Sequence, residues 1–507
     1  MKLTLVDQVV LYAYLLGIVL FGLWFSRKNR SSRHFMDAGG ALSGWVVGLS
    51  LFGTYLSSIS FLANPGKSFD SNWSPFVFSL SLPIAALIAV TWFVPFYRRR
   101  KAVSAYAHLE ERFGSWASNY AIGCYVITQT VRIGAILLLA GMAAEPILGV
   151  DIRIVILVLG IAVIVYTLAG GIEAVIWTDV VQSVVLTVGI VVAIVAILAG
   201  MPEGPKQVFE IAREAVDKHG QNKFSLGSFS FLLQDRTFWV VLVYGLVINL
   251  QNFGIDQTYV QRYATAKDEG AARRSVWLAC WLYLPISALL FFIGTGLFAF
   301  YSVHPELVPD DFSGDRSFAH FIANELPTGV VGLLMAAMLA AAMSSVDSSL
   351  NSCATLICSD LAPRFSGGLI RDSGQQEESD RRILRGATIL IGGIGILIAL
   401  SLVGTDSILD TWWILAGIFG GGMLGLFLLG MLSHRIRGLH AAIGVVAGLF
   451  AIAWMSLSTM KESPLDQSLR LPFDSFLTIV FGTMVILLVG FLTAQVFPGR
   501  SDGDKDR

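Results

Sequence analysis

Residues 340 to 352, AAAMSSVDSSLNS, place one carboxylate and five serines inside a long apolar run. At 100° per residue, Ala341, Ser344, Ser345, Asp347 and Ser348 fall within an arc of about 160° on a helix. This stripe of oxygen atoms carries no lysine, arginine or histidine, so its own helix supplies no counter-charge. Hard oxygen atoms in an apolar segment indicate a binding site for a small cation.

A second polar residue lies deep in an apolar segment, and it carries the opposite charge. Arg132 stands in the run ITQTVRIGAILLLAG, near the middle of a membrane-length stretch. A guanidinium fixed at that depth suits the carboxylate of a bound solute. The alternative is a structural ion pair between Arg132 and Asp179 or Glu173.

The composition indicates an all-α integral membrane protein. The chain has 507 residues, of which 55% are hydrophobic and 14% charged, and its mean hydropathy is +0.69. Soluble domains carry roughly 25% charged residues, so this chain is too apolar for that class. The net charge of -1 gives no reason to expect a nucleic-acid partner. The lipid bilayer is the partner that the composition predicts.

Windows of about 20 apolar residues predict thirteen membrane spans, which start near residues 7, 44, 75, 117, 152, 174, 237, 273, 327, 382, 409, 438 and 473. Basic residues concentrate after the first, third, seventh, ninth, eleventh and thirteenth spans. This asymmetry predicts a multi-pass protein of the plasma (inner) membrane with its amino terminus outside and its carboxyl terminus in the cytoplasm. The longest connection, residues 201–236, is polar and mixed in charge, and we interpret it as an external loop.

Two spans carry residues that interrupt helices. Residues 48–69 combine Gly53, Pro65 and Gly66 with several serines, and residues 249–262 begin with the amides Asn249, Gln251 and Asn252, followed by Gly254 and Asp256. Two interrupted spans at corresponding places in two five-span halves predict an inverted repeat around a central binding site. The alternative for the first interrupted span is that its small residues only allow helices to pack closely.

Three motifs resemble the sodium:solute symporter family, and the likeness is greatest to its sialic acid and sugar branches. They are GGIEAVIWTDVVQ at residues 170–182, QRYATAK at 261–267 and MSSVDSSLNS at 343–352. The resemblance implies a leucine-transporter-like core of two inverted five-helix repeats with two discontinuous helices. The predicted divisions are residues 1–43 for the first span and a basic loop, 44–200 and 237–436 for the repeats, 201–236 for the external loop, and 437–507 for two last spans and a tail.

The resemblance also implies a sodium site between the first interrupted span and the serine stripe. Its ligands would be the backbone carbonyls of Gly53, Leu56 and Ala341 and the hydroxyls of Ser344 and Ser345. Unwound backbone carbonyls and hydroxyls can replace the water shell of a cation. The alternative is that the two serines donate to carbonyls one turn earlier in their own helix.

Some relatives hold a second sodium ion nearby. In this chain that site would comprise Asp179, Asp347 and Ser348, together with Ser344 of the first site. Those relatives carry a hydroxyl where this chain has Asp347. The alternative role for Asp179 is an N-cap at the start of the sixth span.

In the sialic acid transporters an arginine at the position of Arg132 binds the substrate carboxyl group. By the same resemblance, Ser57, Ser58 and Ser60 would hold the rest of the solute, and Asn249 aligns with an asparagine that binds galactose in sodium/sugar transporters. In the position of the inner-gate tyrosine of those transporters this chain has Asn252, with Phe253 next to it.

The function that these observations predict is sodium-coupled import of a small polar solute by alternating access. A carboxylated sugar such as a sialic acid is the first expectation, and a neutral sugar, a small carboxylate or an amino acid is the alternative. A membrane-embedded enzyme is disfavoured because all seven histidines fall in loops or at span ends. A sensor would need a signalling domain and a channel would need polar stripes on several helices. Sodium and one solute are therefore the expected ligands, without an obligate protein partner.

Overall fold

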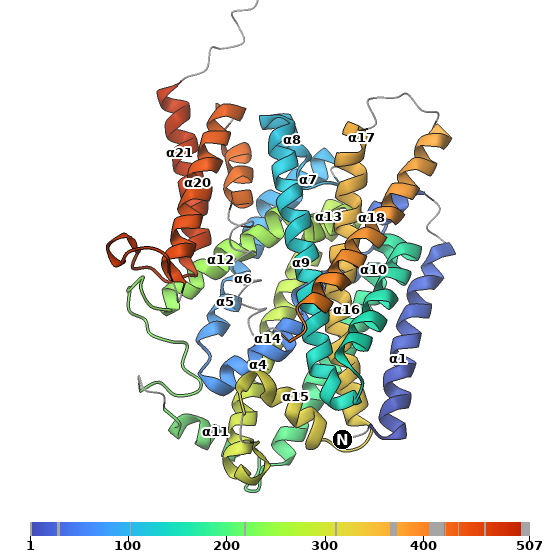
Figure 1. The fold of residues 1–507 in the computed structure, drawn as a ribbon, viewed down its shortest axis with the longest axis vertical. Helices are drawn as coiled ribbons and strands as arrows, with labels where there is room; N and C mark the ends of the chain where they lie inside the picture. Colours follow the sequence, from blue (N-terminus) through green and yellow to red (C-terminus); the bar gives the residue numbers. More distant parts are fainter. Residues whose placement is uncertain are drawn as a thin grey trace, which may run out of the picture.

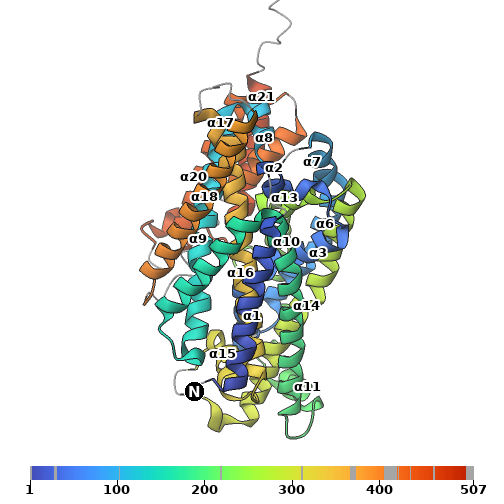
Figure 2. The same cartoon turned by 90° about the vertical axis from the view of Figure 1, so that its right-hand side faces the viewer.

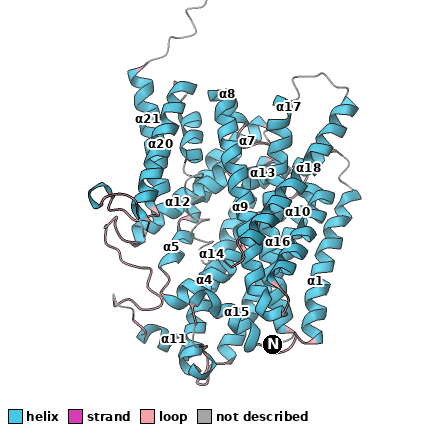
Figure 3. Ribbon diagram, in the orientation of Figure 1, coloured by secondary structure: helices cyan, strands magenta, loops and turns pink. Residues whose placement is uncertain are grey.

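In a computed structural model of the protein, every regular element among the described residues is a helix (Figure 3). Two isolated bridges, between residues 42 and 266 and between 216 and 222, are the extended pairings found in this part of the chain. The structure describes residues 3–27, 31–101, 103–216, 220–309, 312–365, 373–404, 420, 422–433, 435–460 and 463–497.

The helices form one elongated bundle, with α7, α8 and α17 at one end and α11 and α15 at the other (Figure 1). Their bounds are α1 Leu5–Trp24, α2 Ser32–Asp37, α3 Gly44–Tyr55, α4 Ser58–Asp70, α5 Val77–Leu80, α6 Leu82–Ile88, α7 Val94–Arg100, α8 Ala107–Phe113, α9 Ser115–Leu148, α10 Ile152–Ala199, α11 Lys206–Glu214, α12 Phe238–Ile255, α13 Gln257–Thr265, α14 Glu269–Val303, α15 Gly314–Asn324, α16 Val330–Leu356, α17 Ala362–Phe365, α18 Ser373–Ser401, α20 Gly438–Thr459 and α21 Leu477–Val496.

Ten helical segments among the described residues are long and apolar enough to cross a membrane, and one bent pair raises the number to eleven. This count does not confirm the thirteen spans predicted from the sequence. The predicted span near residue 409 falls mostly outside the described residues. The predicted spans near residues 152 and 174 both belong to α10, whose 48 residues would extend about 72 Å, more than twice the apolar thickness of a bilayer.

Gly171 divides α10 into two parts. Its backbone has φ 60° and ψ −155°, outside the helical region, and a Cβ added there would lie 2.8 Å from Phe35 of α2. Only glycine combines this conformation with so close an approach. Glu173, two residues after Gly171, pairs with His34 of α2 at 2.8 Å. The bend of α10 at Gly171 therefore lies beside the basic segment that follows the first span.

The first interrupted span consists of α3 and α4, and the axes of Gly44–Tyr55 and Ser60–Asp70 differ by 51°. The chain leaves the helix at Leu56, and Ser57 begins α4 by accepting the backbone N–H of Ser60 at 3.3 Å. The sequence also predicted an interruption from Pro65 and Gly66, and this part was wrong because both residues lie inside α4. The cap formed by Ser57 sets the break.

The second interrupted span, α12 and α13, breaks at Asp256 as predicted. Asp256 caps α13 by accepting the backbone N–H of Thr258 at 2.8 Å. The carbonyls of Phe253 and Gly254 accept hydroxyls from Tyr263 at 2.9 Å and Tyr97 at 2.6 Å. Tyrosines therefore satisfy the backbone groups that this break frees.

The serine-bearing helix α16 lies in the interior of the bundle, as Figures 1 and 2 both show. In the most apolar stretch of this segment, 89% of the residues are buried. The helix α16 packs against α1, α9, α10 and α18. Asp7 of α1 caps its start by accepting the backbone N–H groups of Gly329 and Gly332, each at 2.8 Å. Because α16 is enclosed by protein, its polar side chains face other helices.

Candidate functional site

The break in the first interrupted span leaves backbone oxygens without partners. Among the described residues, no hydrogen-bond donor reaches the carbonyls of Gly53 or Leu56. These carbonyls form the C-terminal end of α3, which carries the negative end of a helix dipole. The N-terminal end of α4 begins two residues after Leu56 and carries the positive end. One loop thus presents acceptors for a cation and donors for an anion.

Gly53 brings this break against the serine helix. A Cβ added at Gly53 would lie 2.8 Å from Ser183 Oγ and 3.3 Å from Ser344 Oγ. Ala341, Ser344 and Ser345 are each 1% exposed. The carbonyl end of α3 therefore lies beside the hydroxyl of Ser344, one of the two hydroxyls that the sequence assigned to the same site.

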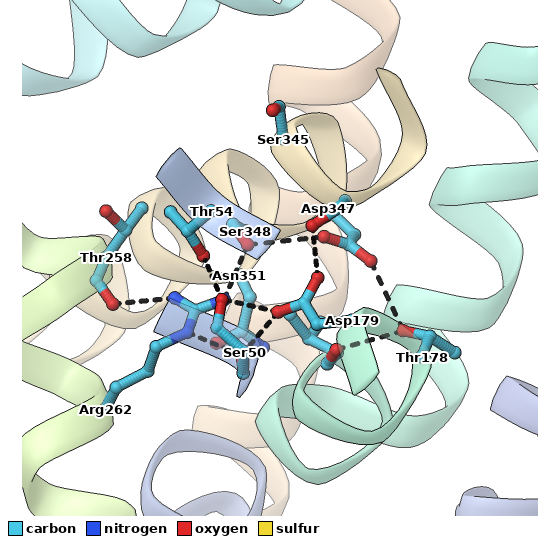
Figure 4. Close-up of polar contacts among 12 residues, drawn as sticks. Ser50, Thr54, Thr178, Asp179, Thr258, Arg262, Ser345, Asp347, Ser348 and Asn351 are labelled. Atoms are coloured by element: carbon cyan, nitrogen blue, oxygen red, sulfur yellow. Dashed lines mark hydrogen bonds and ion pairs between the residues drawn. The ribbon is translucent and has the colours of Figure 1, made fainter. Parts of the chain in front are cut away.

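The two serines behave differently. Ser345 Oγ donates to the carbonyl of Ala341 at 3.2 Å, so the alternative of a bond to the preceding turn is confirmed for this residue. Ser344 Oγ donates instead to Asp179 Oδ1 at 2.5 Å. Figure 4 shows Ser345 turned away from the cluster that surrounds Asp179. The hydroxyls of the predicted stripe therefore do not all face the same site: Ser344 faces Asp179, and Ser345 faces its own helix.

Asp179 forms a fully buried ion pair with Arg262 of α13. The distance from Arg262 Nη2 to Asp179 Oδ2 is 2.8 Å, and both side chains are 0% exposed. Arg262 also donates to Ser50 Oγ and Ser348 Oγ, each at 2.7 Å, while Ser50 donates to Asp179 Oδ2 at 2.5 Å (Figure 4). The proposed N-cap role of Asp179 was wrong, because its oxygens accept from three other helices.

The sequence interpretation missed Arg262. This arginine belongs to one of the basic segments that the charge asymmetry placed in cytoplasmic loops, whereas its side chain lies in the protein interior. The helix α16 itself carries no basic residue beside its serines, but Arg262 of α13 brings a positive charge to them. A usable signal was present, because a buried aspartate needs a cationic partner and Arg262 stands in a motif singled out for its resemblance.

Asp347 has no such partner. It is 0% exposed and accepts hydroxyls from Tyr166 at 2.6 Å, Ser348 at 3.3 Å and Thr178 at 3.4 Å. Among the described residues no lysine, arginine or histidine pairs with it. The cluster in Figure 4 thus contains two carboxylates and one guanidinium.

Arg132 is partly buried on α9, and no described carboxylate lies within ion-pair distance of its guanidinium. The alternative of a structural ion pair is wrong for both suggested partners. Asp179 pairs with Arg262, and Glu173 pairs with His34. The positive charge of Arg132 is therefore not neutralised by a described acidic side chain.

The other expected solute ligands lie near the first break. Ser57 is 5% exposed and Ser60 is partly buried, while the side chain of Ser58 lies outside the described residues. Asn249 is fully buried, donates to Ser81 Oγ at 3.0 Å and accepts the hydroxyl of Tyr55 at 3.4 Å. The Asn249 amide thus contacts the last residue of α3.

Aromatic rings pack around Tyr55 at the end of α3. Its ring lies 5.6 Å from Phe253, 5.1 Å from Tyr259 and 5.1 Å from Tyr283, measured between centroids. Phe253 is therefore part of an aromatic cluster, although the position of the usual gate tyrosine holds Asn252. Four rings from α3, α12, α13 and α14 therefore meet at the end of α3, next to the break.

A bundle of apolar helices with two interrupted spans, unpaired carbonyls at one break and buried hydroxyls opposite, defines a cation-coupled secondary transporter. The chain belongs to the sodium:solute symporter family, whose family model matches residues 35–448. The members of this family are transporters and not enzymes, and sodium is the coupling ion.

Several known proteins are similar over almost the whole chain. The sodium/sialic acid symporter NanT of Aliivibrio fischeri is 32% identical over 98% of this chain and 95% of its own length. The sodium/sialic acid symporter SiaT of Proteus mirabilis is 32% identical over 97% and 95%. The sodium/glucose cotransporter of Vibrio parahaemolyticus is 27% identical over 97% and 91%.

Solved structures show the same fold. A Na⁺-coupled sialic acid symporter in a substrate-bound, outward-open state superposes with a TM-score of 0.87 at 30% identity, covering 97% of this chain and 98% of that one. A nucleobase-cation-symport-1 family transporter in a closed conformation gives a TM-score of 0.57 at 14% identity, covering 92% and 96%, and supports the fold alone. These neighbours are transporters with a leucine-transporter-like fold.

Proposed function

We propose that this protein imports a carboxylated sugar, such as a sialic acid, together with sodium by alternating access. The observation that carries the proposal is the loop at residues 56–57. There the carbonyl end of α3 and the amide end of α4 lie at the same depth, beside buried serines. The first end attracts a cation and the second an anionic solute, so one loop can bind both ligands.

The first sodium ion would bind the carbonyls of Gly53, Leu56 and Ala341 and the hydroxyls of Ser344 and Ser345. The unpaired carbonyls and the approach of Gly53 to Ser344 support this set. The bond from Ser345 to Ala341 leaves lone pairs on the serine oxygen free for a cation.

A second sodium ion would bind near Asp347, with Ser348 and Asp179 at the edge of the site. Arg262 already neutralises one of the two buried carboxylates, so the cluster is one positive charge short when both are ionised. Gln182 lies one helical turn beyond Thr178, and its buried amide faces the hydroxyl of Tyr14. That amide could supply a further oxygen ligand.

The solute would lie beside the first sodium ion. Arg132 would bind its carboxylate, and Ser57, Ser58 and Ser60 would bind its hydroxyl or amide groups, with Asn249 at the inner edge of the pocket. The partly buried guanidinium of Arg132, which no described carboxylate pairs with, supports an acidic solute because a carboxylate would offset the cost of removing this charge from water. The names of two relatives that are 32% identical favour a sialic acid.

For the topology, we propose thirteen crossings of the plasma membrane, with two inverted repeats at residues 44–200 and 237–436. Residues 1–43 and 437–507 would supply the additional spans, and residues 201–236 the external loop. The basic segments containing α2, α8 and α17 would face the cytoplasm, as would the carboxyl terminus, and the amino terminus would lie outside. The gathering of α7, α8 and α17 at one end of the bundle supports this orientation (Figure 1). We expect no obligate protein partner.

Uptake into proteoliposomes tests the function. We expect a labelled sialic acid to accumulate when an inward sodium gradient is imposed, and to stop accumulating when choline replaces sodium. Uptake that continues unchanged in choline would contradict sodium coupling. Sodium-driven uptake of labelled glucose or a labelled small monocarboxylate, but not of labelled sialic acid, would reassign the solute while leaving sodium coupling intact.

Replacement of Arg132 by alanine tests the solute assignment. We expect Arg132→Ala to abolish uptake of carboxylated solutes while sodium still raises the melting temperature of the purified protein. Arg132→Lys should remain impaired, because an ammonium cannot reproduce the two-pronged geometry of a guanidinium. Arg153→Ala, at a mostly exposed arginine near the start of α10, is the control and should transport normally. Normal sialic acid uptake by Arg132→Ala would contradict the assignment.

A further inference from the structure

Part of the external loop exposes apolar side chains. Phe229, Phe231, Leu232 and Leu233 are 60%, 78%, 53% and 44% exposed, respectively. The description of residues 201–236 as polar therefore fits the part around α11 but not this stretch. Four large apolar side chains in five consecutive residues are more than the scattered exposure that soluble surfaces show.

This stretch has a fixed conformation, held to the first turn of α12. The carbonyl of Ser228 accepts the backbone N–H of Phe238 at 2.8 Å, and the carbonyl of Phe229 accepts Trp239 Nε1 at 3.2 Å. The ring of Phe231 stacks on Trp239 with 5.2 Å between centroids and 9° between planes. The exposed apolar groups are thus held on the surface by hydrogen bonds and ring packing.

A second attachment joins the loop to the start of α21. The carbonyl of Leu233 accepts the backbone N–H of Asp474 at 2.9 Å, and Arg236 pairs with Asp474 at 3.2 Å. The Arg236 guanidinium lies over the ring of Phe476, 4.6 Å from its centroid. Figure 1 shows the beginning of α12 next to the loop that joins α20 and α21.

These attachments fix the depth of the loop. Both α12 and α21 are apolar helices of membrane length, and the loop is bonded at the residues where each begins. Its apolar groups therefore lie at the edge of the bilayer, next to side chains that these helices expose, including Trp239 and Val243. The polar residues Gln234, Asp235 and Arg236 come next in the sequence, which gives the order of apolar and polar groups found at a lipid interface.

We propose that residues 229–239 form a membrane-contact loop whose apolar side chains enter the boundary between headgroups and acyl chains. Its partner is the phospholipid leaflet at that side of the membrane, the outer leaflet in the topology proposed above. Phe231 and Trp239 supply an aromatic pair of the kind that anchors proteins at this depth, and Arg236 stays among the headgroups. The loop anchors the outer end of α12, the helix that contains the second break.

A fluorescent label at Leu232 tests this contact in the full-length protein. The four native cysteines are buried, so Leu232→Cys provides an accessible thiol for an environment-sensitive dye. In lipid vesicles we expect blue-shifted emission that is quenched several-fold more by doxyl groups near the headgroup than by doxyl groups near the chain end. Glu214→Cys, at an exposed residue of α11, is the matched control and should stay unquenched in both lipids.

Emission at Leu232→Cys that matches the Glu214→Cys control in both lipids would overturn the proposal. Emission that changes with protein density but not with the quenching lipid would also overturn it, and would assign the loop to contact between copies. The protein without an added cysteine measures background labelling. Because Leu232 is exposed, its substitution should leave folding intact, which elution as a single peak would verify.

Discussion

Ser344 connects the proposed sodium site to the buried ion pair, since its hydroxyl faces Gly53 and donates to Asp179. We expect Ser344→Ala to raise the sodium concentration for half-maximal uptake about tenfold, the equivalent of one lost polar contact of about 1.4 kcal/mol. Ser345→Ala should have a smaller effect because its hydroxyl also bonds to Ala341. Sodium-dependent uptake measures both.

The control for these variants is Ser275→Ala in α14. Ser275 is fully buried, and its hydroxyl donates to the carbonyl of Ala272. If Ser344→Ala and Ser275→Ala both keep the sodium dependence of the unmodified protein, then the serines of α16 serve packing and do not bind sodium.

Arg262 is the second residue whose replacement has a defined outcome. Arg262→Met removes the one guanidinium paired with Asp179 and leaves two buried carboxylates, so it should destabilise the protein by about 3–5 kcal/mol. The double variant Arg262→Met with Asp179→Asn should recover part of that loss, because the unpaired charge is then gone. Thermal melting of purified protein compares the variants. Independent, additive effects of the two changes would contradict a functional ion pair.

At this scale the sequence predicted residue types better than their partners. Ser344, Asp179 and Ser348 were named together, and the structure brings them to one cluster. The role of Arg262 was not predicted, because pairing across 83 residues depends on how α13 turns back after the break. For Arg132 the sequence left solute binding and a structural ion pair as alternatives, and the pairs Asp179–Arg262 and Glu173–His34 occupy both suggested partners of that ion pair.

At the scale of helices, the residues of both interrupted spans indicated a break, whereas the position of the first break at Leu56 and Ser57 followed from the family resemblance. Asp256 serves as a cap and stands where the sequence placed the second break. In the first span, Pro65 was a strong local signal, yet the break occurs at Leu56 because Ser57 caps α4. The total number of spans is not confirmed, although the non-helical backbone of Gly171 divides α10 between the predicted spans near residues 152 and 174.

Gly53 tests whether the close approach of α3 and α16 matters for sodium. A methyl group at this position would meet Ser183 Oγ at 2.8 Å and Ser344 Oγ at 3.3 Å, so Gly53→Ala should push the helices apart. We expect the half-saturating sodium concentration to rise by about tenfold or more, from a strain of about 1–3 kcal/mol. Gly123→Ala in α9, where a Cβ has nothing within 4 Å, should transport normally. Equal sodium dependence in both variants would contradict the close approach.

In the whole molecule, α3 and α13, one half-helix from each interrupted span, are joined to each other. Leu42, just before α3, exchanges backbone hydrogen bonds with Thr265 and Lys267 at the end of α13. Through Ser50 and Arg262, both half-helices also contact Asp179 of α10 and Ser348 of α16. A sodium ion at the site proposed between α3 and α16 would therefore act on an element that includes both half-helices. This arrangement explains how sodium binding could prepare the solute site and control the opening of the inner side.

Linkage requires that sodium and solute each raise the affinity for the other by the same factor. The most direct test is calorimetric titration of the purified protein with a sialic acid, in saturating sodium and in choline, with the reciprocal sodium titration. We predict much tighter solute binding in sodium, an equal factor in the reciprocal experiment, and loss of that factor in Ser344→Ala. Solute that binds equally well in choline would contradict a sodium ion at the junction of α3 and α16.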